Sequence, residues 1–320
     1  MLKVLSLFSG IGAFEKALEN LGVDYDLVGY CEIDKYASKS YAAVHGVSEE
    51  MNLWDVTKIN TSKLPKDIDL ITYGFPCQDI SLAGKQRGFH HEDGSLTRSG
   101  LFFEALRIIE NTKPKIAIAE NVKNLTSKKF SEQFKIVLDS LEAAGYNNYW
   151  KVLNAKDYGI PQNRERVFIV SIRKDIDTGL FEFPKPFPLK KRLRDILDDE
   201  VNEKYYLSDK QTKRLTGNVF TQANLRLQEK DWCDTLLARD YKDPKCVQKD
   251  SHVKEPSLRI RKLTPKECWR LMGFDDTDFE KAEAVNSNTQ LYKQAGNSIV
   301  VDVLEELFCM MLDQDGEIFV

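Results

Sequence analysis

Three short segments of the sequence combine residue types that could carry covalent and acid–base chemistry. The first is Gly74-Phe75-Pro76-Cys77-Gln78, in which a proline that restricts the backbone precedes a thiol. The others are Glu120-Asn121-Val122 and Gln162-Asn163-Arg164-Glu165-Arg166. A thiolate is a strong nucleophile, a carboxyl group can hold or transfer a proton, and a guanidinium group can bind an oxygen. Together they predict nucleophilic catalysis, although a lone cysteine is more often a small buried apolar residue.

A glycine-rich turn follows the first apolar run of the chain. Residues 4–8 are expected to form a buried strand that leads directly into Phe8-Ser9-Gly10-Ile11-Gly12. Glycines let the backbone approach a ligand, and the next helix offers free N–H donors at its start. The third glycine of a dinucleotide-binding fingerprint is missing, because Glu15 stands there. The turn therefore fits a nucleotide-like ligand and, equally well, ordinary strand–helix packing.

Two acidic residues stand where further strands are expected to end. Glu32 follows an expected strand at 27–31, where a carboxylate can accept hydrogen bonds from both ribose hydroxyls of a nucleoside. Asp55 is placed at the end of an expected third strand, where it could accept a hydrogen bond from an adenine amino group. A helix cap is the commoner role of acidic residues at such joints.

The elements that must position these residues alternate along the first half of the chain. Apolar runs at 4–8, 27–31, 68–73, 116–119 and 167–172 are separated by amphipathic stretches at 14–21, 35–44, 101–110 and 131–144. The last of these helices is expected to have Ser131 as its N-cap and to end at Gly145. This alternation predicts an α/β fold with a parallel sheet, helices on both faces and ligands at the carboxyl ends of the strands.

A proline-rich segment, Phe183-Pro184-Lys185-Pro186-Phe187-Pro188, divides the chain, since it excludes a helix interior and a central strand. Residues 187–286 carry more charge and little periodicity, and the pattern returns at 294–312, where a glycine turn is expected to lead into a helix. We therefore predict a catalytic, cofactor-binding domain of residues 1–186 and 287–320, and a smaller domain of residues 187–286.

Composition indicates an ordinary globular protein. With a net charge of -4, the 320-residue chain as a whole is not a basic nucleic-acid binder, and basic clusters at 185–194 and 259–266 are most simply solvated faces. Its six cysteines form no C-x-x-C pair and no zinc-finger spacing, which predicts free thiols in a reducing cytoplasm and no metal. The first apolar run is too short for a secretory signal, and none is long enough to span a membrane.

Six segments, taken in order, resemble the DNA cytosine carbon-5 methyltransferase family, and its small bacterial and phage members in particular. They are residues 8–12, Pro76-Cys77-Gln78, Glu120-Asn121-Val122, residues 162–166, residues 261–268 and Gln294-Ala295-Gly296-Asn297-Ser298. The resemblance covers nearly the whole chain. It implies a Rossmann-like S-adenosylmethionine-dependent methyltransferase sheet with helices on both faces, and makes residues 187–286 a target-recognition domain.

The sequence departs from the family pattern at three positions. Ser6 stands where an acidic residue is frequent, Ala13 where a second glycine is frequent, and Ile33 where an aromatic residue is frequent. These differences affect how adenosine would pack, and they leave the residues for the chemistry unchanged.

The resemblance implies a role for each site residue. Cys77 would add to carbon 6 of cytosine, which makes carbon 5 reactive toward the methyl group of S-adenosylmethionine. Glu120 would hold N3 and the exocyclic amine, Arg166 would hold the carbonyl oxygen, and Arg164 would help to position Cys77 and the base. The cofactor, released as S-adenosylhomocysteine, would bind at Phe8, Ser9, Gly10, Ile11, Gly12, Glu32, Ile33, Asp55, Val56, Pro76, Leu101, Asn297 and Ser298.

Double-stranded DNA is the implied substrate, with the target cytosine flipped out of the helix. Residues 78–99 predict a mobile loop that closes over the base, with a plain surface loop as the alternative. The predicted DNA contacts are Gln78, Ser81, Lys85, Arg87, Thr235, Arg239, Tyr241 and Lys242. We expect a monomer in the cytoplasm of a bacterium, encoded by the bacterium or by a phage and associated with the nucleoid. A cognate restriction endonuclease would act on the same site without a stable complex.

Three other interpretations share part of the pattern. A nicotinamide dehydrogenase would use the glycine turn and Glu32, but it would not need the three catalytic segments together. A tRNA cytosine methyltransferase of similar fold stays open, because only the long region after the proline segment favours DNA. A non-catalytic DNA-binding relative is disfavoured, because the four catalytic residues Cys77, Glu120, Arg164 and Arg166 are all present.

Overall fold

The chain divides into two compact units in its computed structural model. Unit 1 consists of Met1–Asn154, Glu165–Lys185 and Val303–Val320, and unit 2 consists of Ala155–Arg164 and Pro186–Asp302. The structure describes residues 1–76, 89, 97–211, 231–242, 245–249, 259–312 and 317–318. The proline-rich segment contains one boundary between the units, whereas residues 155–164 and 287–302, which we expected in the catalytic domain, belong to unit 2.

Unit 1 is built on a six-stranded sheet with the strand order β2-β1-β3-β4-β7-β5. The strands are β1 (Leu2–Leu7), β2 (Tyr25–Cys31), β3 (Leu70–Tyr73), β4 (Ile116–Val122), β5 (Tyr146–Asn154) and β7 (Glu165–Arg173). β1, β2, β3 and β4 pair in parallel, whereas β7 runs antiparallel to both of its neighbours, β4 and β5. The expected α/β fold is confirmed, and one reversed strand makes the sheet mixed rather than wholly parallel.

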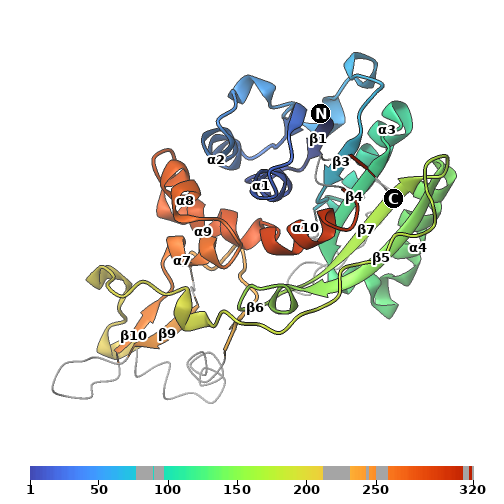
Figure 1. The fold of residues 1–320 in the computed structure, drawn as a ribbon. Helices are drawn as coiled ribbons and strands as arrows, with labels where there is room; N and C mark the ends of the chain where they lie inside the picture. Colours follow the sequence, from blue (N-terminus) through green and yellow to red (C-terminus); the bar gives the residue numbers. More distant parts are fainter. Residues whose placement is uncertain are drawn as a thin grey trace. The chain divides into compact units, whose positions relative to one another are not determined.

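Helices cover both faces of this sheet (Figure 1). They are α1 (Ala13–Asn20), α2 (Lys35–His45), α3 (Phe102–Thr112), α4 (Ser131–Ala143) and α10 (Val301–Phe308), whose first two residues belong to unit 2. α3 and α4 lie on one face, and α1 and α10 lie on the other, where the rings of Phe14 and Phe308 meet with centroids 6.4 Å apart. Among the described residues, no helix is both long and apolar enough to cross a membrane.

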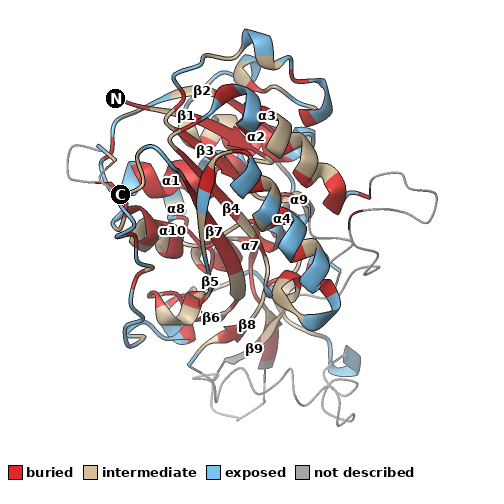
Figure 2. Ribbon diagram, turned by 90° about the vertical axis from the view of Figure 1, so that its right-hand side faces the viewer, coloured by how far each residue is buried: buried red, intermediate tan, exposed pale blue. Residues whose placement is uncertain are grey.

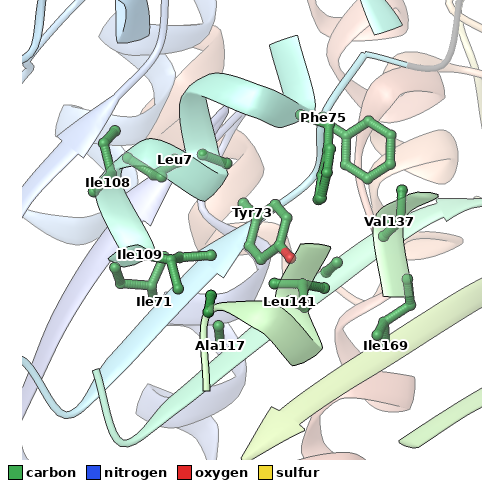
Figure 3. Close-up of a cluster of buried hydrophobic side chains, with 14 of the residues drawn as sticks. Leu7, Ile71, Tyr73, Phe75, Ile108, Ile109, Ala117, Val137, Leu141 and Ile169 are labelled. Carbon is green, nitrogen blue, oxygen red and sulfur yellow. The ribbon is translucent and has the colours of Figure 1, made fainter. Parts of the chain in front are cut away.

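The core beneath α3 and α4 follows the alternation of side chains along the strands. Every second strand residue points into it, namely Leu5, Leu7, Ile71, Tyr73, Ala117, Ala119, Val167 and Ile169. Figure 3 shows part of this layer against Ile108 and Ile109 of α3 and Val137 and Leu141 of α4. The outer side of α4 is exposed in Figure 2, so this helix buries one stripe only, as its amphipathic pattern predicts.

The expected third strand before Asp55 is absent. In the described stretch 46–55, Asn52 forms only an isolated bridge with Tyr30, and Asp55 caps a short 3-10 helix over Val56–Lys58. Its carboxylate accepts a hydrogen bond from the Thr57 N–H at 3.1 Å. The commoner role of acidic residues, that of a helix cap, therefore applies here.

The boundaries of helix α4 and strand β5 also differ from the expectation. Ser131 is the first residue of α4 and not its N-cap, since its hydroxyl donates to the carbonyl of Lys128 instead. The helix does end before Gly145, which has a φ of 102°. β5 lies at the edge of the sheet, and its mixed polar and apolar sequence gives no clear strand pattern.

The described part of unit 2 includes two short strand pairs and the α-helices α7, α8 and α9. β6 (Gln162–Asn163) pairs with β8 (Cys233–Asp234), and β9 (Cys246–Lys249) pairs with β10 (Arg259–Lys262). The helices are α7 (Pro265–Arg270), α8 (Asp276–Glu283) and α9 (Asn288–Asn297). The β6–β8 pair explains why residues 155–164 belong to unit 2.

Gly296 lies inside helix α9, so the glycine turn expected at this position is wrong. A Cβ atom here would lie 2.2 Å from the backbone nitrogen of Ala238 and from the carbonyl carbon of Leu237. The glycine therefore lets the segment 237–238 cross the helix in close contact, which packs α9 against another segment of unit 2.

A fully buried ion pair holds the start of helix α7. The Nη1 and Nη2 atoms of Arg261 lie 2.8 and 2.7 Å from the two carboxylate oxygens of Glu267, and both side chains are 0% exposed. Glu267 also accepts a hydrogen bond from the N–H of Thr264, which completes a capping box. The expectation of a solvated basic face at 259–266 is therefore wrong at Arg261.

Replacing Glu267 with glutamine should strongly destabilise the protein, because the Arg261 charge would stay buried without its counterion. The expected loss in the free energy of unfolding is about 3–5 kcal/mol. The matched control is Asp139→Asn, which breaks the exposed Lys135–Asp139 pair and should cost less than about 1 kcal/mol. Denaturant unfolding measures both, and equal losses would contradict the prediction.

Candidate active site

The carboxyl ends of β1, β2, β3 and β4 meet at one edge of the unit 1 sheet, because these strands are parallel. β7 is reversed, so its first residues reach the same edge, and Arg166 pairs with Val122 in the register. The edge therefore collects the predicted residues 8–12, Glu32, Pro76, Glu120 and Arg166.

The turn after β1 is formed by left-handed backbone conformations. Phe8, Gly10 and Gly12 have φ angles of 54°, 60° and 80°. Ser9 ties the turn to the end of β2, since its N–H donates to the Cys31 carbonyl at 3.0 Å and its Oγ accepts from the Cys31 N–H at 3.2 Å. The Gly10 N–H donates to Oε2 of Glu32 at 2.9 Å. The glycine turn and the predicted ribose-binding carboxylate therefore form one connected structure.

The two glycines of this turn have different surroundings, so the absence of a Cβ atom matters for a different reason at each. A Cβ atom at Gly10 would meet no described atom within 4 Å, so a ligand can approach the backbone at this point. A Cβ atom at Gly12 would lie 2.0 Å from Nε2 of His45 and 2.9 Å from Cε2 of Tyr41. Packing of α2 against the turn therefore requires the second glycine, whereas the first suits contact with a ligand.

His45 supports the turn from the side of α2. Its Nε2 lies 3.1 Å from the carbonyl oxygen of Ile11, and its Nδ1 lies 2.7 Å from Oε1 of Glu19. Both partners are acceptors, so a protonated imidazole satisfies both. Burial alone would lower the pKa of His45, but the hydrogen bond and charge of Glu19, with the nearby Glu15, raise it overall.

Glu32 is held at the end of β2 by its main chain and by its carboxylate. Its Oε1 accepts from the N–H of Asp34 at 2.7 Å, in addition to the Gly10 contact. The side chain of Asn52 bonds to both the N–H and the carbonyl of Glu32, at 3.0 and 2.9 Å. Asn52 was not among the residues predicted from the sequence, because its partner lies 20 positions earlier in the chain and no local motif contains both.

The residues predicted around an adenine base lie directly after Glu32, at Ile33, and in the separate segment 55–56, and they differ in exposure. Ile33 is 73% exposed, and Val56 is buried. The hydroxyl and N–H of Thr57 lower the pKa of Asp55, whose carboxylate is fixed by the cap described above. Trp54 is 44% exposed and has a φ of 60°, so an indole ring stands at the surface beside Asp55.

Glu120 and Arg166 form the predicted catalytic pair. Nε of Arg166 lies 2.9 Å from Oε1 of Glu120, and the two side chains are 16% and 12% exposed. Glu120 pairs with Phe168 in the register, so Arg166 reaches it diagonally across the two strands. The arrangement places a carboxylate for N–H groups beside a cation for a carbonyl oxygen, which suits the edge of a pyrimidine base.

Asn121 connects this pair to the segment that leads to Cys77. Its side chain, which is buried, donates to the carbonyl of Phe75 at 3.0 Å and accepts from the N–H of Val122 at 2.9 Å. The residue lies within the Glu-Asn-Val motif, but the sequence indicated no role for it. Asn121 therefore fixes the end of the β3 segment just before Pro76, which is half-buried.

Cys77 lies outside the described residues, as do the predicted DNA contacts Gln78, Ser81, Lys85 and Arg87. Within the predicted loop at 78–99, Phe89 is described and buried, with its ring near those of Phe75 and Phe102. Leu101, a predicted cofactor residue, packs against the same core at the start of α3. Phe89 is thus part of this core, and the predicted closure of the loop falls on residues outside those described.

Arg164 is buried inside unit 2, where it binds main-chain carbonyls. Nη1 donates to Leu236 at 2.9 Å, and Nη2 donates to Gly296 at 3.1 Å and Ser298 at 2.6 Å. These contacts hold Arg164 within unit 2, and its expected role beside Cys77, which lies outside the described residues, stays a prediction. Ser298 is buried and Asn297 is exposed at the end of α9, and their contact with a cofactor stays a prediction.

A surface turn of unit 2 displays the other predicted DNA contacts. The Thr235 hydroxyl donates to the carbonyl of Asn163 at 2.6 Å, which fixes the start of the turn. Arg239, Tyr241 and Lys242 follow and are exposed, with Nζ of Lys242 5.5 Å from the centroid of the Tyr241 ring. Cations and an aromatic ring suit contact with phosphates and bases.

Alanine at Gly12 should destabilise the protein much more than alanine at Gly10. Both changes impose a left-handed backbone on a residue with a Cβ, at about 1–2 kcal/mol each. Only Gly12→Ala also drives the Cβ into the buried rings of His45 and Tyr41, which adds an overpacking cost of about 1–3 kcal/mol. Thermal and denaturant unfolding measure both variants, and equal losses would show that packing of α2 does not require Gly12.

The stabilisation from His45 should decline as pH rises. Its pKa is higher in the folded protein than in the unfolded chain, so this contribution is complete below the unfolded value of about 6.5 and disappears as pH rises through the folded pKa. His45→Gln removes the titration, so the stability difference between the two proteins should shrink above this point. Unfolding free energies at a series of pH values test this, and a difference independent of pH would contradict it.

Comparison with known proteins identifies the family. The family of C-5 cytosine-specific DNA methylases matches residues 2–312. The orphan methyltransferase M.SPBetaI of Bacillus phage SPbeta is 35% identical over 96% of this chain and 96% of its own length. The type II methyltransferase M2.ScrFI of Lactococcus lactis subsp. cremoris is 38% identical over 96% of this chain and 98% of its own.

Solved structures share the fold. The Dnmt2 methyltransferase of S. pombe has a TM-score of 0.73 at 23% sequence identity, with 96% of this chain and 97% of that chain covered. The methyltransferase EhMeth of Entamoeba histolytica has a TM-score of 0.74 at 18% identity, with 97% of each chain covered. These likenesses confirm the methyltransferase fold, and the match over nearly the whole sequence shows that the chain belongs to the C-5 cytosine-specific DNA methylase family.

Proposed function

We propose that this chain is an S-adenosylmethionine-dependent DNA (cytosine-5-)-methyltransferase in which Cys77 is the covalent nucleophile. The observation that supports it most directly is the Glu120–Arg166 pair, with 2.9 Å between Oε1 and Nε, at the sheet edge where β3 leads toward Cys77. The pair offers an anionic acceptor and a cationic donor side by side, as the exocyclic amine and the carbonyl oxygen of cytosine require.

The residues after β1 and β2 fit the adenosine part of the cofactor. The backbone is open to approach at Gly10, and the Glu32 carboxylate is aimed at the same turn. An ionised carboxylate has about four acceptor positions, so bonds to the two main-chain N–H groups are compatible with bonds to ribose hydroxyls. Ile33 and Asp55 would lie against the adenine. When bound, S-adenosylmethionine supplies an activated methyl group on its sulfonium.

The chemistry begins with the Cys77 thiolate, which adds to carbon 6 of the flipped cytosine and forms a sulfur–carbon bond. The electron pair released into the ring makes carbon 5 nucleophilic, while Glu120 holds N3 and the exocyclic amine, and Arg166 holds the carbonyl oxygen. After methylation, water accepts the carbon 5 proton, and the electron pair of that C–H bond restores the carbon 5–carbon 6 double bond as the sulfur–carbon bond breaks and releases the Cys77 thiolate. The product is 5-methylcytosine.

Duplex DNA is the proposed substrate, and residues 187–286 are the proposed target-recognition domain. Arg239, Tyr241 and Lys242 are proposed to contact DNA, and Arg164 to hold their turn in place through Leu236. We propose a monomer in the cytoplasm, encoded by a bacterium or a phage. Its cognate restriction endonuclease would recognise the same site without forming a stable complex, as in a restriction–modification system.

Cys77→Ser should abolish methylation while DNA binding persists, because a hydroxyl is a far weaker nucleophile than a thiolate. We expect turnover to fall by at least about a thousandfold. Transfer of a tritium-labelled methyl group from S-adenosylmethionine measures the rate, and gel-shift titration measures the affinity for DNA. Cys309→Ser, at an exposed cysteine, is the matched control and should retain both.

A trapping experiment tests the covalent step directly. Bisulfite sequencing of DNA from expressing cells first identifies the methylated site. With S-adenosylmethionine present, a duplex with 5-fluorocytosine at that site should then trap the wild-type protein through residue 77, since after methylation the fluorine cannot leave carbon 5 as a proton does. Trapping at another cysteine, or normal methylation by Cys77→Ser, would overturn the assignment.

A further inference from the structure

We propose that Asn52 is a positioning residue for the cofactor site, which holds the end of β2 so that the Glu32 carboxylate stays directed at the ribose. The inference rests on the proposed function, because the ribose is that of the proposed cofactor. Asn52 would not touch the cofactor itself; it would act through Glu32.

The amide of Asn52 uses all of its hydrogen-bonding positions. Oδ1 accepts from the N–H of Glu32 at 3.0 Å and from the N–H of Trp54 at 2.8 Å. Nδ2 donates to the carbonyl of Glu32 at 2.9 Å and to Oγ of Ser38 at 2.9 Å. The side chain is buried, at 5% exposure, so each of these bonds is shielded from competing water.

Asn52 supplies hydrogen bonds to the main chain of Glu32, which lies just beyond the end of strand β2. Leu53 N–H donates to the carbonyl of Tyr30 at 2.7 Å, but β2 ends at Cys31 and Glu32 lies beyond the strand. The Asn52 amide then binds the N–H and the carbonyl of Glu32 together, as a neighbouring strand would. A side-chain amide presents an acceptor and a donor side by side at every pH of interest, which suits this pairing.

The same amide also fixes the Trp54-Asp55 segment. Trp54 has a left-handed backbone, which is unfavourable for a residue with a Cβ. Its N–H is held by Asn52, and its carbonyl accepts from Sγ of Cys31 at 3.0 Å. One buried side chain thus holds the main chain at both Glu32 and Trp54, which flank the proposed adenosine site.

The support for Asn52 continues into helix α2. Ser38 is fully buried, and its Oγ lies 2.9 Å from Nδ2 of Asn52 and 3.0 Å from the hydroxyl of Tyr30. This chain of bonds joins α2, β2 and the 52–55 segment. The Glu32 carboxylate accepts from the N–H groups of Gly10 and Asp34, and loss of Asn52 would leave both of these hydrogen bonds available. The main chain of Glu32 would lose two hydrogen bonds and become more mobile.

The test measures recognition of the ribose. Calorimetric titration gives the dissociation constants of S-adenosylhomocysteine and of its analogue without the ribose 2′-hydroxyl. Asn52→Ala should weaken S-adenosylhomocysteine about tenfold, the effect of losing roughly one well-placed hydrogen bond. It should also reduce the preference for the parent compound over the analogue, which a general loss of stability would not do.

Two further variants sharpen the result. Asn52→Asp keeps an acceptor for the N–H groups of Glu32 and Trp54 but puts an oxygen against the Glu32 carbonyl, so it should lose the same preference. Asn60→Ala is the matched control, because Asn60 also accepts from a main-chain N–H, that of Ser62 at 3.1 Å, away from this site. It should bind like the wild type. Thermal unfolding confirms that each variant is folded.

A double-mutant cycle shows whether Asn52 acts through Glu32. If it does, Asn52→Ala should add little to the loss caused by Glu32→Gln. Fully additive losses, or an unchanged preference in Asn52→Ala, would overturn the inference. If Asn52→Ala does not fold, Ser38→Ala removes one of the four bonds and should show the same loss of preference in smaller measure, and an unchanged preference there would also overturn it.

The same titrations distinguish a failure of the proposed cofactor binding from a failure of the proposed role of Asn52. A wild-type protein that does not bind S-adenosylhomocysteine would contradict the proposed function. A wild-type protein that binds it and is weakened by Glu32→Gln, with Asn52 variants equal to wild type, would overturn the role of Asn52 alone.

Discussion

Strand β7 lies between β4 and β5 and runs antiparallel to both, so its first residues meet the last residues of β4. This reversal brings Arg166 within 2.9 Å of Glu120 at the edge where the parallel strands end. In a wholly parallel sheet the start of β7 would lie at the opposite edge, about the length of a strand away. The pairing of one carboxylate with one guanidinium therefore depends on the direction of a single strand.

Two asparagine side chains form hydrogen bonds with main-chain groups at this edge, just beyond the ends of strands. Where a strand ends, its main-chain groups lose their pairing partners and must find others. Asn121 supplies a donor to the carbonyl of Phe75, and Asn52 supplies both a donor and an acceptor to Glu32. Both side chains are buried and fix backbone beside proposed reacting groups. The precision of the site thus comes partly from residues that would not touch a substrate.

Much of the fold and part of the site could be predicted from the sequence, because these features are local. Buried strands appear as apolar runs, and Glu32 and Glu120 stand at the ends of such runs. β5 was missed because it lies at the edge of the sheet and alternates irregularly. The partners of Asn52, His45 and Arg261 depend on how distant segments fold together or on burial, which no local pattern reports.

The anchoring of the surface turn in unit 2 has a consequence for engineering DNA specificity. Gln162 accepts from the N–H of Leu236 at 3.0 Å, Arg164 donates to the carbonyl of the same residue, and Gly296 leaves room for the segment that follows. Beyond this anchor Arg239, Tyr241 and Lys242 are exposed, whereas the buried Asp240 accepts from the N–H of Leu237 at 2.8 Å. A chimaera should therefore accept another relative's sequence at the exposed positions of this proposed DNA-contacting turn, provided that Gln162, Arg164, Gly296 and Asp240 are retained.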